Sequence, residues 1–443
     1  MARFNRGMDL DQQLLLPPSL RDWIPEGHLV WFIRDAVDSL ELDELTDRYR
    51  QCGKGELPYQ PSMMLSVLIY SYATGIFSSR KIATQLEESV AYRVLAENQM
   101  PSHRSICRFR QQHLDLFPEL FVQVVRLAHE AGIAKVGTLT VDGSKVKANA
   151  SKRKAMSYGR MLQEEQRLKS EIKTLLRLAT EKDEQEDADL GPDFREDQLP
   201  AELADRKARL ARIQETKARL EARKKQEAED RDKDRDDDAK RQGKKPPAER
   251  PSARKHSKGA PRPTDQENFT GPDSRIMLSN GAFEQCYNTQ IAAAEGSRII
   301  VAADVVSSAA DVRQLLPITV AAMDNTGEPV HRLLADAGYC SEANLDALEA
   351  AEIDAYVATG REGSQEVRMP TRPATQRMAR KLKTKRGRRR YRKRKHAVEP
   401  IFGWVKSVLG FRSFSVRGIE KVRGEWNLMC LALNLRQMAR KLA

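Results

Sequence analysis

Cysteine is scarce in this chain, and its spacing excludes two kinds of protein. Five cysteines are scattered over 443 residues, with no CxxC pair and no cysteine–histidine pairing. A disulfide-rich scaffold and a zinc site are therefore not expected, and a reducing cytoplasm is the predicted compartment. The polar opening MARFNRGMDLDQQ shows no signal-peptide core.

Long apolar runs are missing as well. The main apolar stretch, residues 63–77, is interrupted by serine and threonine and is too short to cross a bilayer. It predicts instead a buried helix that begins after Pro61. Apolar residues make up 40% of the chain and charged residues 31%, which allows real hydrophobic cores and excludes a wholly disordered protein.

Acidic residues are nearly absent from the C-terminal part. The net charge is +13, yet residues 371–443 hold 22 lysines and arginines against three acids, and residues 371–395 hold no acid. Such a block repels itself in isolation. It indicates a nucleic-acid partner, because each phosphate contact releases condensed counterions. The alternative is a disordered basic tail, but apolar sequence with helical spacing resumes directly after the block.

The first 135 residues show helical periodicity and no strand pattern. Ser79 and Ser102 can each cap a short helix, and the second helix is basic and free of acids. This arrangement predicts a helix-turn-helix that binds DNA, with an ordinary helical bundle as an equal alternative. The arginines of the second helix are Arg104, Arg108 and Arg110.

From residue 136 onward the pattern becomes one of strands alternating with helices. KVGTLTVDGSKVKA predicts a strand with Asp142 at its end, and QCYNTQIAAA with RIIVAADV predicts a hairpin. HRLLADAGY predicts a strand that ends at Asp336, and DAYVAT a further strand, with helices over 309–323 and 344–351. We therefore expect a multi-domain α/β protein whose mixed sheet is flanked by helices.

A charged insertion separates the first predicted strand from the rest of the sheet. Two heptad-like apolar stripes within 160–225 predict an antiparallel helical hairpin, and residues 226–265 predict a disordered linker because they lack large apolar side chains. The expected domains are a helical DNA-binding domain, residues 1–135; an insertion, residues 151–275; and a catalytic sheet domain, residues 136–150 and 276–443.

Three acids are candidates for one cluster at the edge of this sheet. Asp142 and Asp336 end strands that can lie side by side, and open sheets bind ligands at that edge. No aspartate follows Asp354, and among the later glutamates Glu399 is best placed, at or just before the start of a helix that Pro400 opens. Clustered carboxylates beside a basic block favour two hard divalent cations, which can activate water and stabilise the leaving oxygen of a phosphodiester.

Each of these assignments has an alternative. The two aspartates can be turn residues and Glu399 a helix cap. Asp304, which also ends a strand, competes with Asp336 for the second position, although the predicted strand order disfavours it. Lys406 lies seven positions after Glu399, about two helical turns, and is expected to face the same way and hold a phosphate.

Several segments resemble the bacterial insertion-sequence transposases of the DDE type. They are TVDGSKVKANASK, QCYNTQIAAA, LLADAGYCSEANL, VEPIFGWVKSVLGFRSF, PSHRSICRFR and RGIEKVRGEWNLMCLALNL. The similarity covers nearly the whole chain except about 160–265. It departs from the family at one place: relatives have a tyrosine seven and an arginine four residues before the glutamate, whereas here Tyr391 and Arg394 are each one residue off, and Arg392 and Lys395 hold those positions.

The resemblance implies a ribonuclease H-like core that cuts and joins DNA at transposon ends, with two Mg²⁺ or Mn²⁺ ions held by Asp142, Asp336 and Glu399. It implies double-stranded DNA as the partner, both terminal inverted repeats and target, and a homodimer or larger assembly on the ends, at the bacterial nucleoid. The resemblance also makes Lys406 a DNA-contacting base. The expected DNA contacts are Arg104, Arg108, Arg110, Arg388, Arg389, Arg390, Arg394, Lys395 and Lys406.

Two other functions remain open at this point. One is a catalytically inactive DNA-binding protein derived from a transposase, which the presence of all three acids disfavours. The other is a metal-dependent DNA nuclease that cuts without joining.

Overall fold

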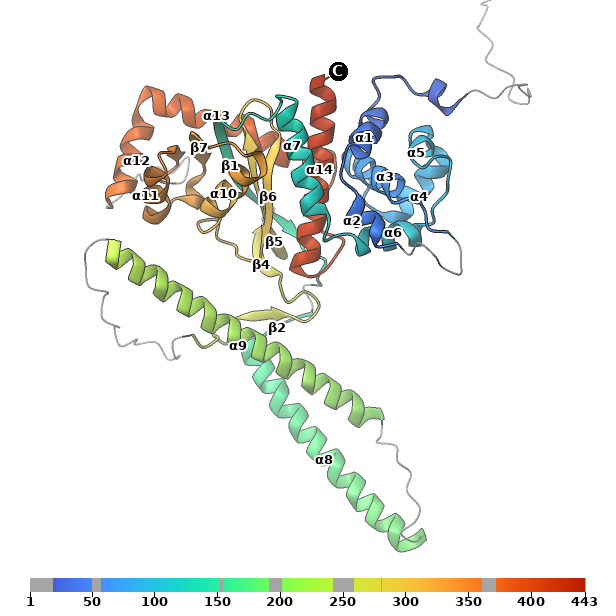
Figure 1. Cartoon of the computed structure of the whole chain (residues 1–443). Helices are drawn as coiled ribbons and strands as arrows, with labels where there is room; N and C mark the ends of the chain where they lie inside the picture. The colour runs from blue at the N-terminus through green and yellow to red at the C-terminus, as the bar shows by residue number, and fades with distance from the viewer. Residues whose placement is uncertain are drawn as a thin grey trace, which may run out of the picture.

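Helices from both ends of the chain pack together beside a central sheet (Figure 1). The computed structural model describes residues 19–49, 57–151, 154–190, 201–241, 259–279, 281–360 and 372–442. Within these ranges, no helix is both long and apolar enough to cross a membrane.

The N-terminal helices lie close to where the sequence predicts them. Pro61 opens α3 (Pro61–Thr74), and Ser102 caps α6 (His103–Gln112) by accepting a hydrogen bond from the backbone N–H of Ser105 at 3.2 Å. Ser79 is not a cap, because α4 (Ser79–Glu88) already begins at this residue. The remaining elements of this part are η1 (Leu20–Trp23), α1 (Leu29–Asp38), α2 (Asp43–Asp47), α5 (Val90–Leu95) and α7 (Phe117–Glu130).

The C-terminal helix α14 (Ile419–Leu442) joins the N-terminal helices to the sheet. It packs against α3 and α7 and also against β6 (Ile300–Val306), and Figure 1 shows it between the two groups of elements. Its Trp426 is fully buried. Apolar residues of the N-terminal helices, the sheet and α14 form one continuous cluster, so residue 135 does not separate two hydrophobic cores.

The sheet is mixed, as expected, and has the strand order of a ribonuclease H-like fold. Strands β5 (Ala282–Ala294), β1 (Thr138–Lys147), β7 (Arg332–Ala335) and β8 (Asp354–Val357) lie side by side in that order. Strand β5 is antiparallel to β1, whereas β7 and β8 run parallel to it. Strands β4 (Arg275–Ser279) and β6 both pair with β5.

The helices that flank the sheet come largely from the C-terminal half. They are α10 (Leu315–Thr326), α11 (Glu342–Ala350), α12 (Pro373–Lys383) and α13 (Lys385–Gly403), with short helical turns at η3 (Ala337–Tyr339) and η4 (Trp404–Val408). The basic block is therefore helical. Thr384 separates α12 from α13 and caps α13 by accepting a hydrogen bond from the N–H of Gly387 at 2.9 Å.

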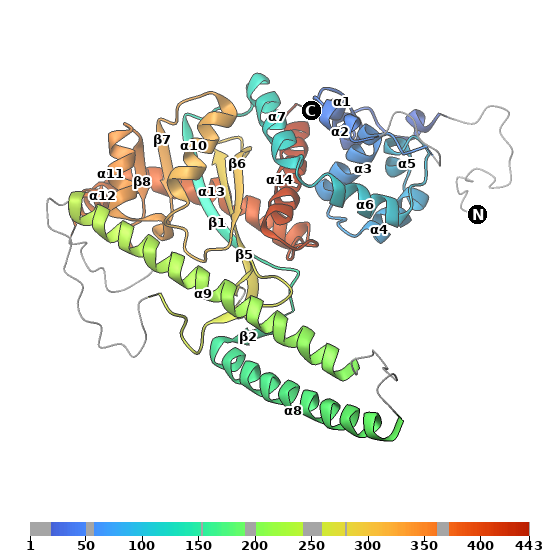
Figure 2. The same ribbon diagram turned by 60° about the horizontal axis from the view of Figure 1, so that its bottom comes forward.

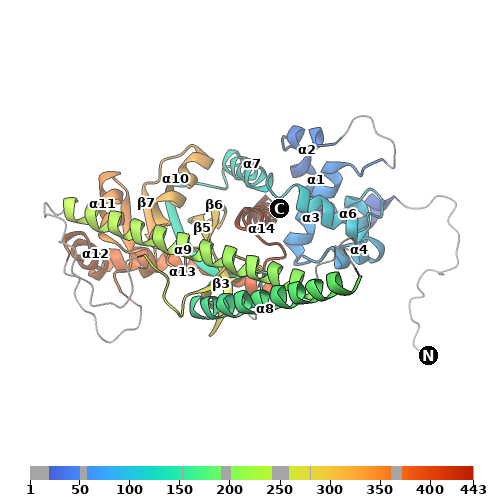
Figure 3. The same cartoon turned by 90° about the horizontal axis from the view of Figure 1, so that it is seen from below.

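The insertion contains the predicted helical hairpin. Helices α8 (Tyr158–Leu190) and α9 (Ala201–Arg241) pack through a small apolar cluster of Met161, Leu168, Ile213 and Leu220. Strands β2 (Ala155–Ser157) and β3 (Gln266–Asn268) pair at its base. Figures 2 and 3 show α9 extending under the sheet.

The predicted disordered linker is wrong for its first part, because α9 continues to Arg241. Three ion pairs explain this. Arg223 and Glu227 are one helical turn apart and form an ion pair at 3.6 Å, while Arg313 of the sheet domain reaches Asp230 at 3.2 Å and Asp234 at 2.5 Å. Such pairs stabilise an exposed helix without apolar burial. The linker residues 242–258 lie outside the described residues.

Candidate active site

Asp142 lies on β1, and Asp336 directly follows the end of β7, the neighbouring parallel strand. Strand β1 pairs with β7 as far as Thr140 opposite Leu334, and continuing that register by two residues places Asp142 opposite Asp336. The sequence predicts that Asp142 ends its strand, and this prediction is wrong. Pairing with the longer β5 extends β1 to Lys147. Asp142 lies instead just beyond the point where the pairing of β1 with β7 ends.

Asp336 leaves β7 and caps the turn that follows. Its Oδ1 accepts a hydrogen bond from the backbone N–H of Gly338 at 2.9 Å, which holds η3. Burial raises the pKa of Asp336, and burial raises the pKa of Asp142 to about 6. The negative charge of Asp336 contributes to the shift at Asp142, against the opposing effect of Arg394. These are two like charges in a partly desolvated place, which a cation would stabilise.

Glu399 lies inside α13 and not near its start, because the basic block is part of the same helix. Pro400 is therefore an interior proline. It has no N–H to donate to the carbonyl of His396, and the Nε of Arg298 donates to that carbonyl instead, at 3.1 Å. This replacement bond explains how the helix continues through the proline and keeps Glu399 on a regular turn.

Arg394 connects two of the predicted site acids. Its Nη1 donates to Oδ2 of Asp142 at 3.1 Å, and its Nη2 lies 3.8 Å from Oε1 of Glu399. We had predicted Arg394 as a DNA contact. That assignment is not supported, because only 10% of its side chain is exposed and its charge is turned toward carboxylates. The helix α13 thus contributes both Glu399 and its counter-ion.

Asp304 is placed away from this cluster. It lies on β6, which pairs with β5 and not with β1, and its Oδ1 accepts a hydrogen bond from Nε of Arg423 at 2.9 Å. The structure therefore keeps Asp304 two strands from Asp142, while Asp336 directly follows the neighbouring strand.

A polar network behind the cluster was missed by the sequence analysis. Asp311 accepts hydrogen bonds from Lys145, Asn288 and Gln290. We had placed Asp311 in a helix over 309–323, but α10 begins only at Leu315. The missed signal was the run of polar residues 288–290 in QCYNTQIAAA, which are fully buried in β5.

Lys406 does not share a regular helical face with Glu399. The helix changes to a π-helical turn at Trp404, which rotates the following residues. The Nζ of Lys406 donates to Oγ of Ser144 at 2.7 Å and to the carbonyl of Lys145 at 2.8 Å. Burial lowers the pKa of Lys406, and no described carboxylate is bonded to it.

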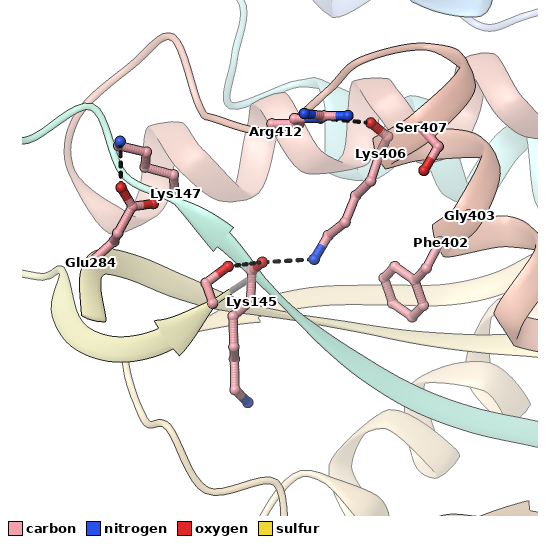
Figure 4. Close-up of a pocket in the computed structure, with 9 residues that line it drawn as sticks. Lys145, Lys147, Glu284, Phe402, Gly403, Lys406, Ser407 and Arg412 are labelled. Atoms are coloured by element: carbon pink, nitrogen blue, oxygen red, sulfur yellow. Dashed lines mark hydrogen bonds and ion pairs between the residues drawn. The ribbon is translucent and has the colours of Figure 1, made fainter. Parts of the chain in front are cut away.

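Lys406 lines a pocket of about 590 Å³ beside the C-terminal half of β1 (Figure 4). In Figure 4 the ammonium of Lys406 meets the carbonyl of Lys145, and Lys147 faces Glu284. The lining residues are Lys145, Lys147, Ser279, Glu284, Phe402, Gly403, Lys406, Ser407 and Arg412. The pocket is basic and open enough to admit an anionic group.

The other predicted DNA contacts divide into exposed and buried residues. On α13, Arg388, Arg389 and Lys395 are exposed and Arg390 is half-buried; on α6, Arg104 and Arg108 are exposed.

Arg110 is buried, which contradicts its predicted role as a DNA contact. Its Nη1 donates to the carbonyl of Phe77 at 2.7 Å and to the hydroxyl of Tyr72 at 3.3 Å. Tyr72 in turn donates to the buried carboxylate of Glu425 at 2.9 Å. Arg110 therefore serves the contact between α6, α3 and α14 and cannot reach a phosphate.

The carboxylates of the cluster are the kind of ligand that a hard divalent cation prefers, although the three side chains do not converge on one point. Asp142, Asp336 and Glu399 offer only carboxylate oxygens, and Arg394 supplies positive charge among them. Within the described ranges, no three histidine, cysteine, aspartate or glutamate side chains converge closely enough to hold an ion in this arrangement. Arg394, placed between Asp142 and Glu399, accounts for their separation.

Two family models match the chain. Residues 18–112 match the transposase domain DUF772, and residues 259–435 match the transposase DDE domain. The second range contains Asp336 and Glu399, whereas Asp142 precedes it, on the other side of the insertion. A ribonuclease H-like sheet with acids at its edge and these two matches define the class: the chain is a DNA transposase. The two matches together support an insertion-sequence transposase of the DDE type. No curated protein and no solved structure matches it.

Proposed function

We propose that this transposase cleaves phosphodiester bonds at transposon ends and joins the freed 3′-OH to target DNA, with Asp142, Asp336 and Glu399 holding two Mg²⁺ or Mn²⁺ ions. The observation that carries the proposal is that Asp336 directly follows β7, the strand parallel and adjacent to the one that holds Asp142, and that Arg394 links Asp142 to Glu399. Bound there, the ions would generate a hydroxide nucleophile and neutralise the leaving oxygen.

The chain's own groups prepare this site. The bond from Gly338 fixes one oxygen of Asp336 and leaves the other available as a ligand. Arg394 compensates the charge of Asp142 and Glu399 before ions arrive. Its displacement from Asp142 would then bring the acids together around the ions.

DNA would be held on both sides of the cluster. Lys406 carries a positive charge without a described carboxylate partner. Its Nζ is bonded to Ser144, which lies two residues after Asp142 on β1. Two strand residues span about 6.6 Å, so a phosphate at Lys406 would belong to a nucleotide close to the one being cut. The exposed arginines of α13 would bind neighbouring phosphates, and Arg104 and Arg108 of α6 would contact the inverted repeats.

The test uses purified full-length protein and labelled duplexes that contain the inverted repeats flanking the gene. With Mg²⁺, the wild type is expected to nick the end and transfer it to a target plasmid, and Asp142→Asn, Asp336→Asn and Glu399→Gln are expected to do neither while still binding the ends. Asp304→Asn is the matched control, because it removes an acid from the next strand pair without touching the cluster.

Two outcomes would favour the alternatives. Cleavage without any strand-transfer product indicates a nuclease. If the wild type and Asp142→Asn both bind the ends but neither cuts them, the chain is a DNA-binding protein without catalytic activity.

A further inference from the structure

Asp311 lies in the segment between β6 and α10 and reaches back across the sheet. Its Oδ1 accepts three hydrogen bonds, from Nζ of Lys145 at 3.1 Å, Nδ2 of Asn288 at 2.6 Å and Nε2 of Gln290 at 2.8 Å. Only 21% of its side chain is exposed. A surface loop residue would not need three donors on one oxygen, two of them from a central strand.

The two amides that bind Asp311 are fully buried in β5. In the register between β1 and β5, Asn288 lies opposite Lys145 and Gln290 opposite Gly143, so all four residues share the same face of the sheet. Burying an amide is costly unless it is hydrogen-bonded. Asn288 and Gln290 are thus buried polar residues of β5 whose common partner is Asp311.

Two glycines make room for this carboxylate, and both lie one or two residues after a proposed metal-holding aspartate. A Cβ at Gly143 would lie 2.5 Å from Nε2 of Gln290 and 3.1 Å from Oδ1 of Asp311. A Cβ at Gly338 would lie 3.1 Å from Oδ1 of Asp336 and 3.2 Å from Oδ2 of Asp311. Neither glycine has a positive φ, so what they supply is space.

The network ends on the turn that orients Asp336. Gln290 donates to Asp311 and accepts a hydrogen bond from the hydroxyl of Tyr339, which is buried. Tyr339 is the last residue of η3, and Asp336 is the cap of the same turn. Asp311 is therefore connected to this turn through Gln290 and Tyr339, and its Oδ2 occupies space next to Gly338 that a Cβ at this position would approach to 3.2 Å.

We infer that Asp311 is a fourth acid of the active centre, a positioning residue that sets the Asp336 turn for divalent-cation binding and holds Lys145 through an ion pair. The inference rests on the proposed function, since it assigns Asp336 to the metal. Residues that orient metal-holding side chains typically change metal affinity or activity by about 10–100-fold when substituted.

The test compares Asp311→Asn with Asp304→Asn, two substitutions that remove the same charge from neighbouring parts of the fold. Two readouts are needed: the rise in melting temperature of the full chain with increasing Mn²⁺ in the absence of DNA, and the Mg²⁺ concentration that gives half-maximal end cleavage. For Asp311→Asn we expect both metal midpoints to rise about tenfold, with end-DNA affinity unchanged. Asp304→Asn should match the wild type in both.

A double substitution keeps the inference testable if Asp311→Asn folds poorly. Gly338→Ala should raise the metal midpoint by itself, and Asp311→Ser should relieve part of that effect in the double variant, because the added methyl group and Asp311 compete for one space. Metal midpoints equal to wild type in Asp311→Asn, or purely additive effects in the double variant, overturn the inference. If the wild type binds Mn²⁺ in an Asp311-dependent way but cuts no DNA, the proposed function fails and the inference stands.

Discussion

Arg394 donates to Oδ2 of Asp142 at 3.1 Å and at the same time approaches Oε1 of Glu399 at 3.8 Å, so one guanidinium serves two acids that are 257 residues apart in the sequence. The two side chains of the Arg394–Asp142 pair are 10% and 14% exposed. This pair ties α13 to β1 and sets the position of Glu399 relative to the sheet.

Replacing Arg394 by alanine is expected to destabilise the metal-free protein. Asp142 would remain buried without its cation, and breaking a buried pair by removing one partner typically costs about 3 kcal/mol or more in the free energy of unfolding. Urea denaturation in EDTA measures the loss, and Arg392→Ala, an exposed neighbour on the same helix, should change stability by less than about 0.5 kcal/mol. Similar losses in the two variants would contradict this role for Arg394.

The pKa of Asp142 predicts how stability depends on pH. Burial raises this pKa from 3.8 to about 6 in the folded protein, so the native state binds more protons than the unfolded chain between these values. The stability conferred by protonated Asp142 is complete below pH 3.8 and is lost as the pH rises to about 6, a change on the order of 3 kcal/mol.

Asp142→Asn should remove that pH dependence. In EDTA, the unfolding free energy of the wild type relative to Asp142→Asn is expected to fall between pH 4 and pH 6.5 and then stay level, as measured by denaturant titration at each pH. A constant difference across this range would show that Asp142 titrates normally. Added Mg²⁺ should reduce the loss in the wild type at pH 7, because bound cation compensates the buried charge.

Much of the fold was predictable because its patterns are local. The strand at RIIVAADV, the break after LLAD and the proline at the start of α3 each depend on a few neighbouring residues. The order of strands followed from the connections between them, and with it the choice of Asp336 over Asp304 as the neighbour of Asp142.

Other features depend on contacts that local patterns do not contain. Arg110 and Arg108 look alike in the sequence, and only the packing of Tyr72 and Glu425 buries the first. The length of α9 depends on ion pairs with Arg313, and the role of Asp311 depends on buried amides in a strand far along the chain. Each is decided by tertiary partners.

Lys406 is expected to contribute one phosphate contact. Lys406→Ala should weaken binding to end DNA and to unrelated DNA alike, and should reduce the slope of log affinity against log salt by about 1. Fluorescence anisotropy at several salt concentrations measures this. Lys147→Ala is the control from the same pocket, because Glu284 at 2.7 Å already neutralises Lys147. Equal slopes for Lys406→Ala and the wild type would mean that Lys406 only anchors Ser144 and the carbonyl of Lys145.

Arg108 and Arg110 provide a matched pair on α6 that separates DNA binding from folding. Arg108 is exposed, so Arg108→Ala should lower affinity for the inverted repeats with no change in melting temperature.

Arg110 is 6% exposed and bonded to Phe77 and Tyr72, next to the buried Glu425. Arg110→Ala should therefore lower the melting temperature, because buried acceptors lose their donor, a change of about 1–3 kcal/mol in unfolding free energy. Thermal melts and anisotropy on both variants make the comparison. A normal melting temperature with weakened DNA binding in Arg110→Ala would place this arginine at the DNA after all and would contradict the packing of α6 against α3 and α14.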